Sequence, residues 1–300
     1  MIERGNHKSA LSNASELQKN IMNDVARGFS LPLVLSDAVH LPNAAIAPLG
    51  IAQQDGYDEH GNKKSKFRLT HDQSFKGPSG TSLNSRTNMD KLPKCMFGHA
   101  LSRMLHYIIA LRGRHPSTPI LLGKYDLASA YRRAHLSPQI STESLTVHDG
   151  ILLMALRMTF GGSAYPSLWS CISECMCDLA NDIIQCRTWD HQSLHSPIQH
   201  LIPPAKRLPQ NTPFAQAKEL AMEYPINDIG IVDVYTDDMP PICLDSGDNA
   251  ERCAAAVPLA VHIMNRPVQA GEPLPRDDVL SLTQLSQEGA MEEVKQSSAG

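Results

Sequence analysis

The sequence predicts an α+β fold: an antiparallel sheet that carries helices on one face. Residues 95–112 and 166–186 place apolar side chains at helical spacing. The runs at 118–127 and 229–235 are apolar enough to be buried strands, and SLTVHDGILLMALRM is typical of a hairpin that turns at its Asp-Gly pair. Strands and helices in this order favour an α+β layer.

Residues 1–45 form a leader of uncertain role. Within it, SELQKNIMNDVARGF predicts a short helix capped by Ser15. Residues 46–94 are rich in Gly, Asp, Asn, Ser and Lys, which predicts loops around one strand, KFRLT at 66–70.

The helix at 95–112 is expected to end at Gly113, and the helix at 166–186 has Pro166 in its first turn. The strand at 118–127 delivers Asp126 at its carboxyl end.

The segment 187–225 contains six prolines and predicts an irregular surface insertion. After the strand at 229–235, DNAERCAAAVPLAVHIM predicts a helix disturbed at Pro258. Residues 269–300 are polar and acidic, which predicts a disordered tail.

Composition favours a globular intracellular protein. The chain is 42% hydrophobic and 19% charged, with no apolar run of 18 residues and no signal-peptide core, so no membrane partner is expected. Seven cysteines, an odd number in no secreted pattern, favour a reducing compartment.

Charge is unevenly distributed along the chain. Residues 61–140 hold 14 Lys and Arg against 3 Asp and Glu, a net charge of +11, whereas the remainder carries −15. A segment this basic is typical of a surface that binds a polyanion such as nucleic acid, although long cationic side chains also coat ordinary surfaces.

The stretch DVYTDDMPP places Asp237 and Asp238 directly after an apolar run, as Asp126 follows another. If the two strands are neighbours, three carboxylates converge, and like charges so close need a counter-charge. Mg²⁺ supplies it through oxygen ligands, and two such ions clamp a phosphoryl transfer. A polar turn at 236–238 and a helix cap at Asp126 are the structural alternatives.

Four segments resemble the motifs of reverse transcriptases, in that family's order. They are KFRLTHD (66–72), YDLASAY (125–131), FGGSAYPSLW (160–169) and YTDD (235–238). The resemblance covers about residues 60–265, and retrotransposon polymerases are the most similar members. It implies a fingers-like region at 46–116 and a palm-like region at 117–268.

The resemblance also implies a role for each matching residue. Asp126 and Asp237 would be the principal ligands of two Mg²⁺ or Mn²⁺ ions, with Asp238 as a supporting carboxylate and the Leu127 backbone carbonyl completing the set. Tyr131 would lie under the sugar of the incoming nucleotide and exclude a 2′-hydroxyl.

Four further residues would hold the nucleotide. Lys66 and Arg68 would bind the triphosphate, and Phe160 with Gly161 would shape the floor under the nascent base pair. The expected function is an RNA-directed DNA polymerase, a nucleotidyltransferase that uses template, primer and deoxynucleoside triphosphates.

Some features depart from that family. Thr236 stands where an apolar residue is common, Pro240 and Pro241 interrupt the expected hairpin strand, and no thumb is predicted after residue 265. An inactive retroelement remnant that at most binds nucleic acid is therefore the alternative.

A zinc-organised interaction protein is a third hypothesis. Its candidate ligands are Cys171, Cys175, Cys177, Cys186, His191, His195 and His200. Only Cys171 and Cys175 have the spacing of a helical ligand pair, and cysteine is also a frequent core residue.

Overall fold

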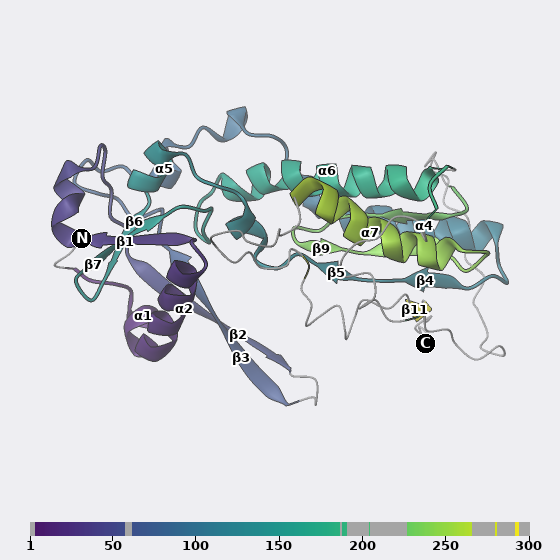
Figure 1. Cartoon of the computed structure of the whole chain (residues 1–300), viewed down its shortest axis with the longest axis horizontal. Coiled ribbons are helices and arrows are strands. Elements are labelled where there is room, and N and C mark those ends of the chain that lie inside the picture. The colour runs from purple at the N-terminus through teal and green to yellow at the C-terminus, as the bar shows by residue number, and fades with distance from the viewer. Residues whose placement is uncertain are drawn as a thin grey trace. The chain divides into compact units, whose positions relative to one another are not determined.

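The computed structural model describes residues 4–57, 62–186, 188–190, 204, 227–265, 280 and 292–293. It confirms a mixed architecture of helices and antiparallel strand pairs (Figure 1). The chain divides into two compact units. The first unit holds the described residues of 4–92 and 131–169, and the second holds those of 93–130 and from 170 onward.

The first unit is built on two antiparallel sheets. Its elements are α1 (Lys8–Ser12), α2 (Ala14–Ala26), β1 (Ser30–Val34), η1 (Leu35–His40), β2 (Leu49–Tyr57), β3 (Lys63–His71), α3 (Leu83–Arg86), η2 (Met89–Lys91), α5 (Pro138–Thr142), β6 (Leu145–His148) and β7 (Ile151–Ala155). Strand β7 lies between β1 and β6, and β2 pairs with β3.

The leader at 1–45 contributes to the core of this unit in its described part. Ala10, Leu17 and Ile21 of α1 and α2 are buried in one cluster with apolar residues of the sheets, namely Leu49, Ile51, Leu69 and Leu153. Burying apolar side chains against a sheet is the main favourable term in folding. Helices α1 and α2 therefore hold the β2–β3 hairpin that carries Lys66 and Arg68.

Two predictions for the first unit were wrong. Helix α2 begins at Ala14 with Asn13 at the N-cap, so Ser15 lies inside the first turn. Residues 46–94 hold two strands rather than one, because LGIAQQDGY pairs with β3 although it contains few strand-forming residues. The predicted hairpin turn is confirmed: Asp149 and Gly150 have φ of 46° and 74°, the positive pair of a type I′ turn.

The second unit contains a four-stranded antiparallel sheet in the order β11-β4-β10-β8 and a separate pair, β5 with β9. Its elements are η3 (Phe97–His99), α4 (Ala100–Arg114), β4 (Ile120–Leu122), β5 (Tyr125–Asp126), most of α6 (Tyr165–Gln185), β8 (Gly230–Val232), β9 (Asp238–Met239), β10 (Pro241–Leu244), α7 (Asn249–Asn265) and β11 (Glu292–Glu293). The short η4 (Ala130–Arg133) begins at its boundary.

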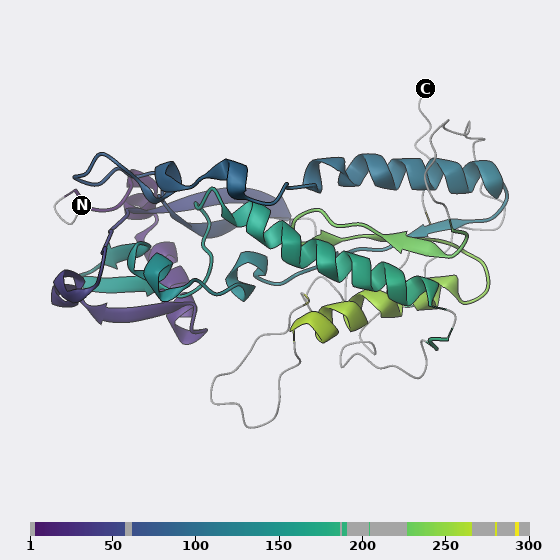
Figure 2. The same ribbon diagram turned by 90° about the horizontal axis from the view of Figure 1, so that it is seen from above.

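The helices cover both faces of the four-stranded sheet, not one face as predicted. Tyr107 and Leu111 of α4 pack in one cluster with Ile120, Ile231, Ile242 and Leu244. Gly230 and Cys243 are paired and lie on the other face of the sheet from Ile231 and Ile242, since side chains alternate along a strand. Cys253 of α7 lies against Gly230, so α7 covers that face. The strands run between α4 and α7 (Figure 2). Apolar residues on both sides of β4 and β10 required a second covering layer.

The predicted strand at 118–127 is two strands, β4 and β5. The interruption at residues 123 and 124 faces Pro240 and Pro241, which have no N–H to donate to a ladder. Gly123 instead donates its N–H to the Pro241 carbonyl at 2.9 Å.

Helix α4 continues through Gly113 and ends at Arg114, so the predicted end at Gly113 was wrong. Pro116 disfavours helical geometry at His115, which ends the helix there. The helix predicted at 166–186 is confirmed as α6, with Trp169, Met176 and Ile184 of its apolar face buried. The helix predicted around Pro258 is α7, which continues through this proline.

Most of the predicted insertion at 187–225 lies outside the described residues. So does most of the predicted tail at 269–300, except Leu280, which bridges Leu127, and β11, which pairs with β4; at these positions the tail is ordered. No helix in the described part of the chain is both long and apolar enough to cross a membrane.

Candidate functional site

Asp126 and Asp238 lie directly opposite each other in the β5–β9 pair of the second unit. Asp237 belongs to the turn before β9, and its carbonyl accepts the Leu127 N–H at 2.9 Å. The strands expected at 118–127 and 229–235 are not neighbours, because β10 lies between β4 and β8. The aspartates come together instead because the chain turns back after Tyr235 and β9 pairs with β5, which places Asp238 rather than Asp237 opposite Asp126.

The turn that carries Asp237 is a tight two-residue connection. Tyr235 and Asp238 exchange backbone hydrogen bonds of 2.9 and 3.0 Å, and Thr236 between them has a φ of 59°. Positive φ at the first central position alone is the pattern of a type II′ turn. A β-branched residue is strained there, at a cost of roughly 1–3 kcal/mol. The turn thus holds the Asp237 backbone in one conformation.

Two buried side-chain contacts fix the chain just before this turn. Arg103 of α4 donates to both carboxylate oxygens of Asp233, at 2.7 and 2.5 Å, and the Asp233 side chain is 6% exposed. Asn181 of α6 bonds both the N–H and the carbonyl of Val232, at 2.9 and 2.8 Å. The start of the segment that carries Asp237 and Asp238 is therefore held by two helices.

Sequence reasoning missed Arg103, Asn181 and Asp233. A usable signal was present for Asp233, which stands inside the apolar run IGIVDVY. A carboxylate buried in such a run requires a cationic partner. No local pattern indicates that this partner is Arg103, 130 residues away.

A cation already lies beside the aspartates. Lys124 Nζ is 3.5 Å from the Asp238 carboxylate, with both side chains more than a third exposed. Solvent screens such a pair, so it contributes little to stability. It supplies part of the counter-charge that adjacent carboxylates need.

The candidate residues of the first unit form a row of side-chain contacts, except for Lys66. The Arg68 guanidinium lies 5.5 Å from the Phe160 ring centroid, and that ring lies 5.5 Å from Tyr131. Tyr131 in turn meets Trp169 edge-on at 6.3 Å. Lys66 is exposed on the same face of β3 as Arg68, two residues away. The structure thus brings Arg68, Tyr131 and Phe160 together.

Gly161 makes the close backbone approach that its residue type suggested. A Cβ atom at Gly161 would lie 1.8 Å from the His71 carbonyl oxygen, and its φ is 132°. His71 also donates its N–H to the Phe160 carbonyl at 2.8 Å. This contact joins the end of β3 to the loop that carries Phe160.

His71 is buried beside Arg132, and neither of its ring nitrogens has a hydrogen-bond partner in the described part of the chain. Burial, followed by the nearby Arg132 charge, lowers the pKa of His71 from 6.5 to about 3. Arg132 is itself paired with buried Asp24 at 2.7 Å. His71 is therefore neutral in the folded chain across the physiological range.

We expect the free energy of unfolding to fall as the pH is lowered from 6.5 towards 3. In this window the unfolded chain protonates His71 and the folded chain does not, so this residue contributes a loss of about 1.4 kcal/mol per pH unit. Urea denaturation of wild type and His71→Gln at several pH values measures the slope. The His71→Gln slope should be smaller by that amount; equal slopes would assign the pH dependence to other groups.

Metal-binding side chains, namely those of His, Cys, Asp and Glu, do not cluster in threes or more within the described residues in a way that could hold a metal ion. The donor set at Asp126, Asp237 and Asp238, all carboxylate oxygen, nevertheless has the chemistry that Mg²⁺ prefers.

The candidate zinc ligands do not assemble in the described part. Cys171 and Cys175 are exposed, whereas buried Cys177 donates its thiol hydrogen to the Val232 carbonyl at 3.1 Å. His191, His195 and His200 lie outside the described residues.

No protein-family model matches the chain, and no curated protein matches it. Solved structures of foamy viral enzymes are similar to it. A foamy viral protease-reverse transcriptase in complex with double-stranded DNA matches with a TM-score of 0.46 and 10% identity, over 83% of this chain and 29% of its own. The native prototype foamy virus protease-reverse transcriptase matches with a TM-score of 0.41 and 12% identity, over 87% and 23%. The CSH mutant of that enzyme matches with a TM-score of 0.42 and 11% identity, over 87% of this chain and 24% of its own. The chain spans about a quarter of the length of these proteins.

Proposed function

We propose that the chain is the RNA-directed DNA polymerase domain of a retroelement, which extends a primer on a nucleic-acid template with deoxynucleoside triphosphates. The observation that carries the proposal is the placement of Asp126 opposite Asp238, with Asp237 in the adjoining turn. The order of the four sequence motifs and the basic charge of residues 61–140 support it.

In this proposal Asp126 and Asp237 hold two Mg²⁺ or Mn²⁺ ions, with Asp238 and the Leu127 carbonyl as further ligands. Bound metal would neutralise charge at the phosphate that reacts. The protein's own contribution is positional. The β5–β9 pairing and the strained turn fix the backbone of all three aspartates before substrate arrives, so little reorganisation remains.

The first unit would supply the contacts to the nucleotide. The exposed Lys66 ammonium and the Arg68 guanidinium would bind the triphosphate, one as a point charge and the other as a planar fork. Arg68 Nε is buried and has no hydrogen-bond partner among the described residues. Tyr131, held between Phe160 and Trp169, would present a rigid ring to the sugar, and Phe160 with Gly161 would support the base pair.

A second candidate function is that of a remnant that binds nucleic acid without polymerising. The ion pair between Lys124 and Asp238 favours it, because a lysine that neutralises one carboxylate weakens the demand for a metal. The described aspartates also do not form a three-residue metal group.

Primer extension tests the proposal. Wild type is assayed on poly(rA)·oligo(dT) with Mg²⁺ or Mn²⁺ beside Asp237→Asn, and Asp228→Asn serves as a control because Asp228 is an exposed carboxylate paired with Arg114. We expect Asp237→Asn to lose at least about 100-fold in rate, since a metal ligand contributes several kcal/mol. Asp228→Asn should retain the wild-type rate.

Either of two results would contradict the proposal. Full activity in a folded Asp237→Asn variant would remove the metal assignment. No extension by folded wild type that still binds the primer–template duplex would leave the remnant as the function.

A further inference from the structure

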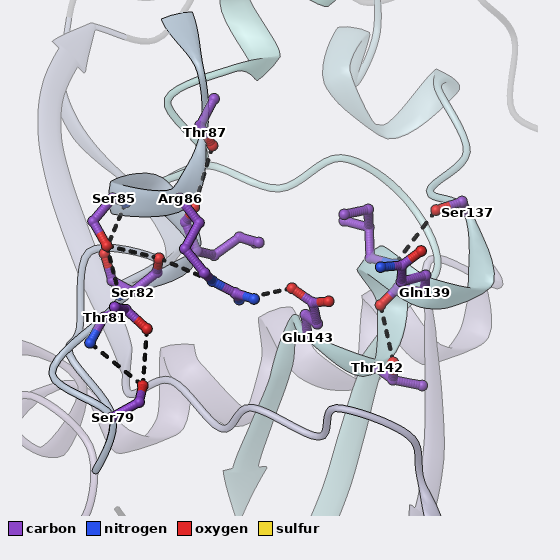
Figure 3. Close-up of polar contacts among 12 residues, drawn as sticks. Ser79, Thr81, Ser82, Ser85, Arg86, Thr87, Ser137, Gln139, Thr142 and Glu143 are labelled. Carbon is purple, nitrogen blue, oxygen red and sulfur yellow. Dashed lines mark hydrogen bonds and ion pairs between the residues drawn. The ribbon is translucent and has the colours of Figure 1, made fainter.

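The first unit contains a cavity of about 950 Å³ that none of the roles above uses. Four segments line it: residues 43–47 before β2, the loop from Asp72 to Ser82 after β3, Leu83 and Arg86 of α3, and Glu143 at the end of α5. Figure 3 shows Arg86 and Glu143 meeting across it, with Ser79 and Thr81 on the neighbouring loop. This volume is within the range of small-ligand sites in proteins.

Both carboxylates of this cavity have a partner. Glu143, whose side chain is 6% exposed, pairs with the Arg86 guanidinium at 2.7 Å. Asp72 lies at hydrogen-bond distance, 3.0 Å, from the His7 imidazole. Lys76 lines the cavity and has no ion pair among the described residues, so its ammonium can donate to a ligand.

The remaining polar groups suit an anion with several oxygen atoms. Arg86 Nε donates to the Ser82 carbonyl, and one terminal guanidinium nitrogen pairs with the Glu143 carboxylate. Among the described residues the other guanidinium hydrogens are left to donate to a ligand. The Ser79 and Thr81 hydroxyls are 2.8 Å apart, and Gly77 N–H donates to the Thr81 carbonyl at 3.0 Å, so the loop is held in shape. Charge-assisted donors of this kind bind phosphate.

The other wall of the cavity is apolar. Ile46, Phe75 and Leu83 line it, and Arg4 lies 4.8 Å from the centroid of the Phe75 ring. A ligand that fills the cavity must therefore combine an anionic end with a flat or apolar body.

We propose that this cavity binds a phosphorylated nucleoside, with the phosphate on Lys76 and Arg86 and the base against Ile46, Phe75 and Leu83. The ligand is either a free nucleotide or one unit of a single strand, which share this chemistry. None of the three candidate metal-binding aspartates, Lys66 or Arg68 lines the cavity, and the proposal does not rest on the proposed polymerase function.

Binding is measured with two probes, AMP by calorimetry and a fluorescein-labelled dT8 oligonucleotide by anisotropy. EDTA is present and no primer–template is added, so the outcome is independent of polymerase activity. The variants are Lys76→Met and the double variant Arg86→Gln/Glu143→Gln, which leaves a neutral pair rather than an unpaired buried charge. Lys91→Met is the matched control, an exposed lysine that does not line the cavity.

We expect Lys76→Met and the double variant each to weaken binding about tenfold, because each removes a charge-assisted contact. Lys91→Met should bind as wild type does. If wild type binds both probes and the cavity variants bind both more weakly, the site takes free nucleotides. If wild type binds dT8 but not AMP, and the cavity variants bind dT8 more weakly, the site takes a single strand. The proposal would be overturned if neither probe bound, or if Lys76→Met and Lys91→Met had equal effects on binding.

Discussion

Replacing Arg103 with methionine is expected to lower the free energy of unfolding by about 3–5 kcal/mol, because it leaves the buried Asp233 carboxylate without its cation. The pair is bidentate, with distances of 2.7 and 2.5 Å. Glu174 adds to the penalty. Burial raises the pKa of the Glu174 carboxyl; the nearby Arg103 charge lowers it and the Asp233 charge raises it further. Without Arg103 two carboxyl groups would face each other in a poorly hydrated place.

Chemical denaturation of four proteins measures this effect. Wild type and Arg103→Met are compared with Arg114→Met, which removes a cation from the same helix but from an exposed pair with Asp228. The Arg114 variant should lose less than about 1 kcal/mol. The double variant Arg103→Met/Asp233→Asn should recover most of the loss, since the amide oxygen can still accept the Val234 N–H. Equal losses for Arg103→Met and Arg114→Met would show that Asp233 is hydrated.

The same pair links stability to the candidate site. Asp233 lies four residues before Asp237, and the turn between them contains the strained Thr236. Strain of this kind persists only where the surrounding structure fixes the backbone. Arg103 on α4 and Asn181 on α6 provide that constraint, so we infer that they fix the backbone that leads to Asp237 and Asp238.

Features governed by local chemistry could be predicted from the sequence. The Asp149-Gly150 turn follows from the tolerance of these residues for positive φ, and α6 follows from its periodic apolar face. Strand β2 could not be predicted, because Gln, Asp and Gly have weak strand propensity and only pairing with β3 makes this segment extended.

The candidate site was predictable in part. The two apolar runs that lead to aspartates suggested that the aspartates meet, and Asp126 does lie opposite Asp238. The supposed reason was wrong, because β8 is separated from β4 by β10 and the contact is made by β9 after the turn. The register was not predictable, because a shift by one residue depends on the turn and on the two prolines that follow it. The metal and nucleotide roles of these residues stay predictions. The partners Arg103 and Asn181 are distant in sequence, and no periodicity indicates them.

Replacing Gly161 with alanine is expected to cost about 4 kcal/mol or more, enough to disrupt folding of the first unit. The added methyl carbon would lie 1.8 Å from the His71 carbonyl oxygen and 3.0 Å from the carbonyl carbon. The neighbour is backbone at the end of β3, so it cannot turn away as a flexible side chain would. Relief requires moving β3 or the Phe160 loop, and it breaks the 2.8 Å hydrogen bond between His71 and Phe160.

Gly150→Ala separates this collision from backbone strain. Gly150 also has a positive φ, 74°, but a methyl group there meets nothing within 4 Å. Alanine at Gly150 should therefore cost only the conformational penalty of about 1–2 kcal/mol. Thermal unfolding of both variants measures the difference. If Gly161→Ala loses no more than Gly150→Ala, then the Phe160 loop does not pack against β3 in solution, and the contact between Arg68 and Phe160 that depends on this packing is lost with it.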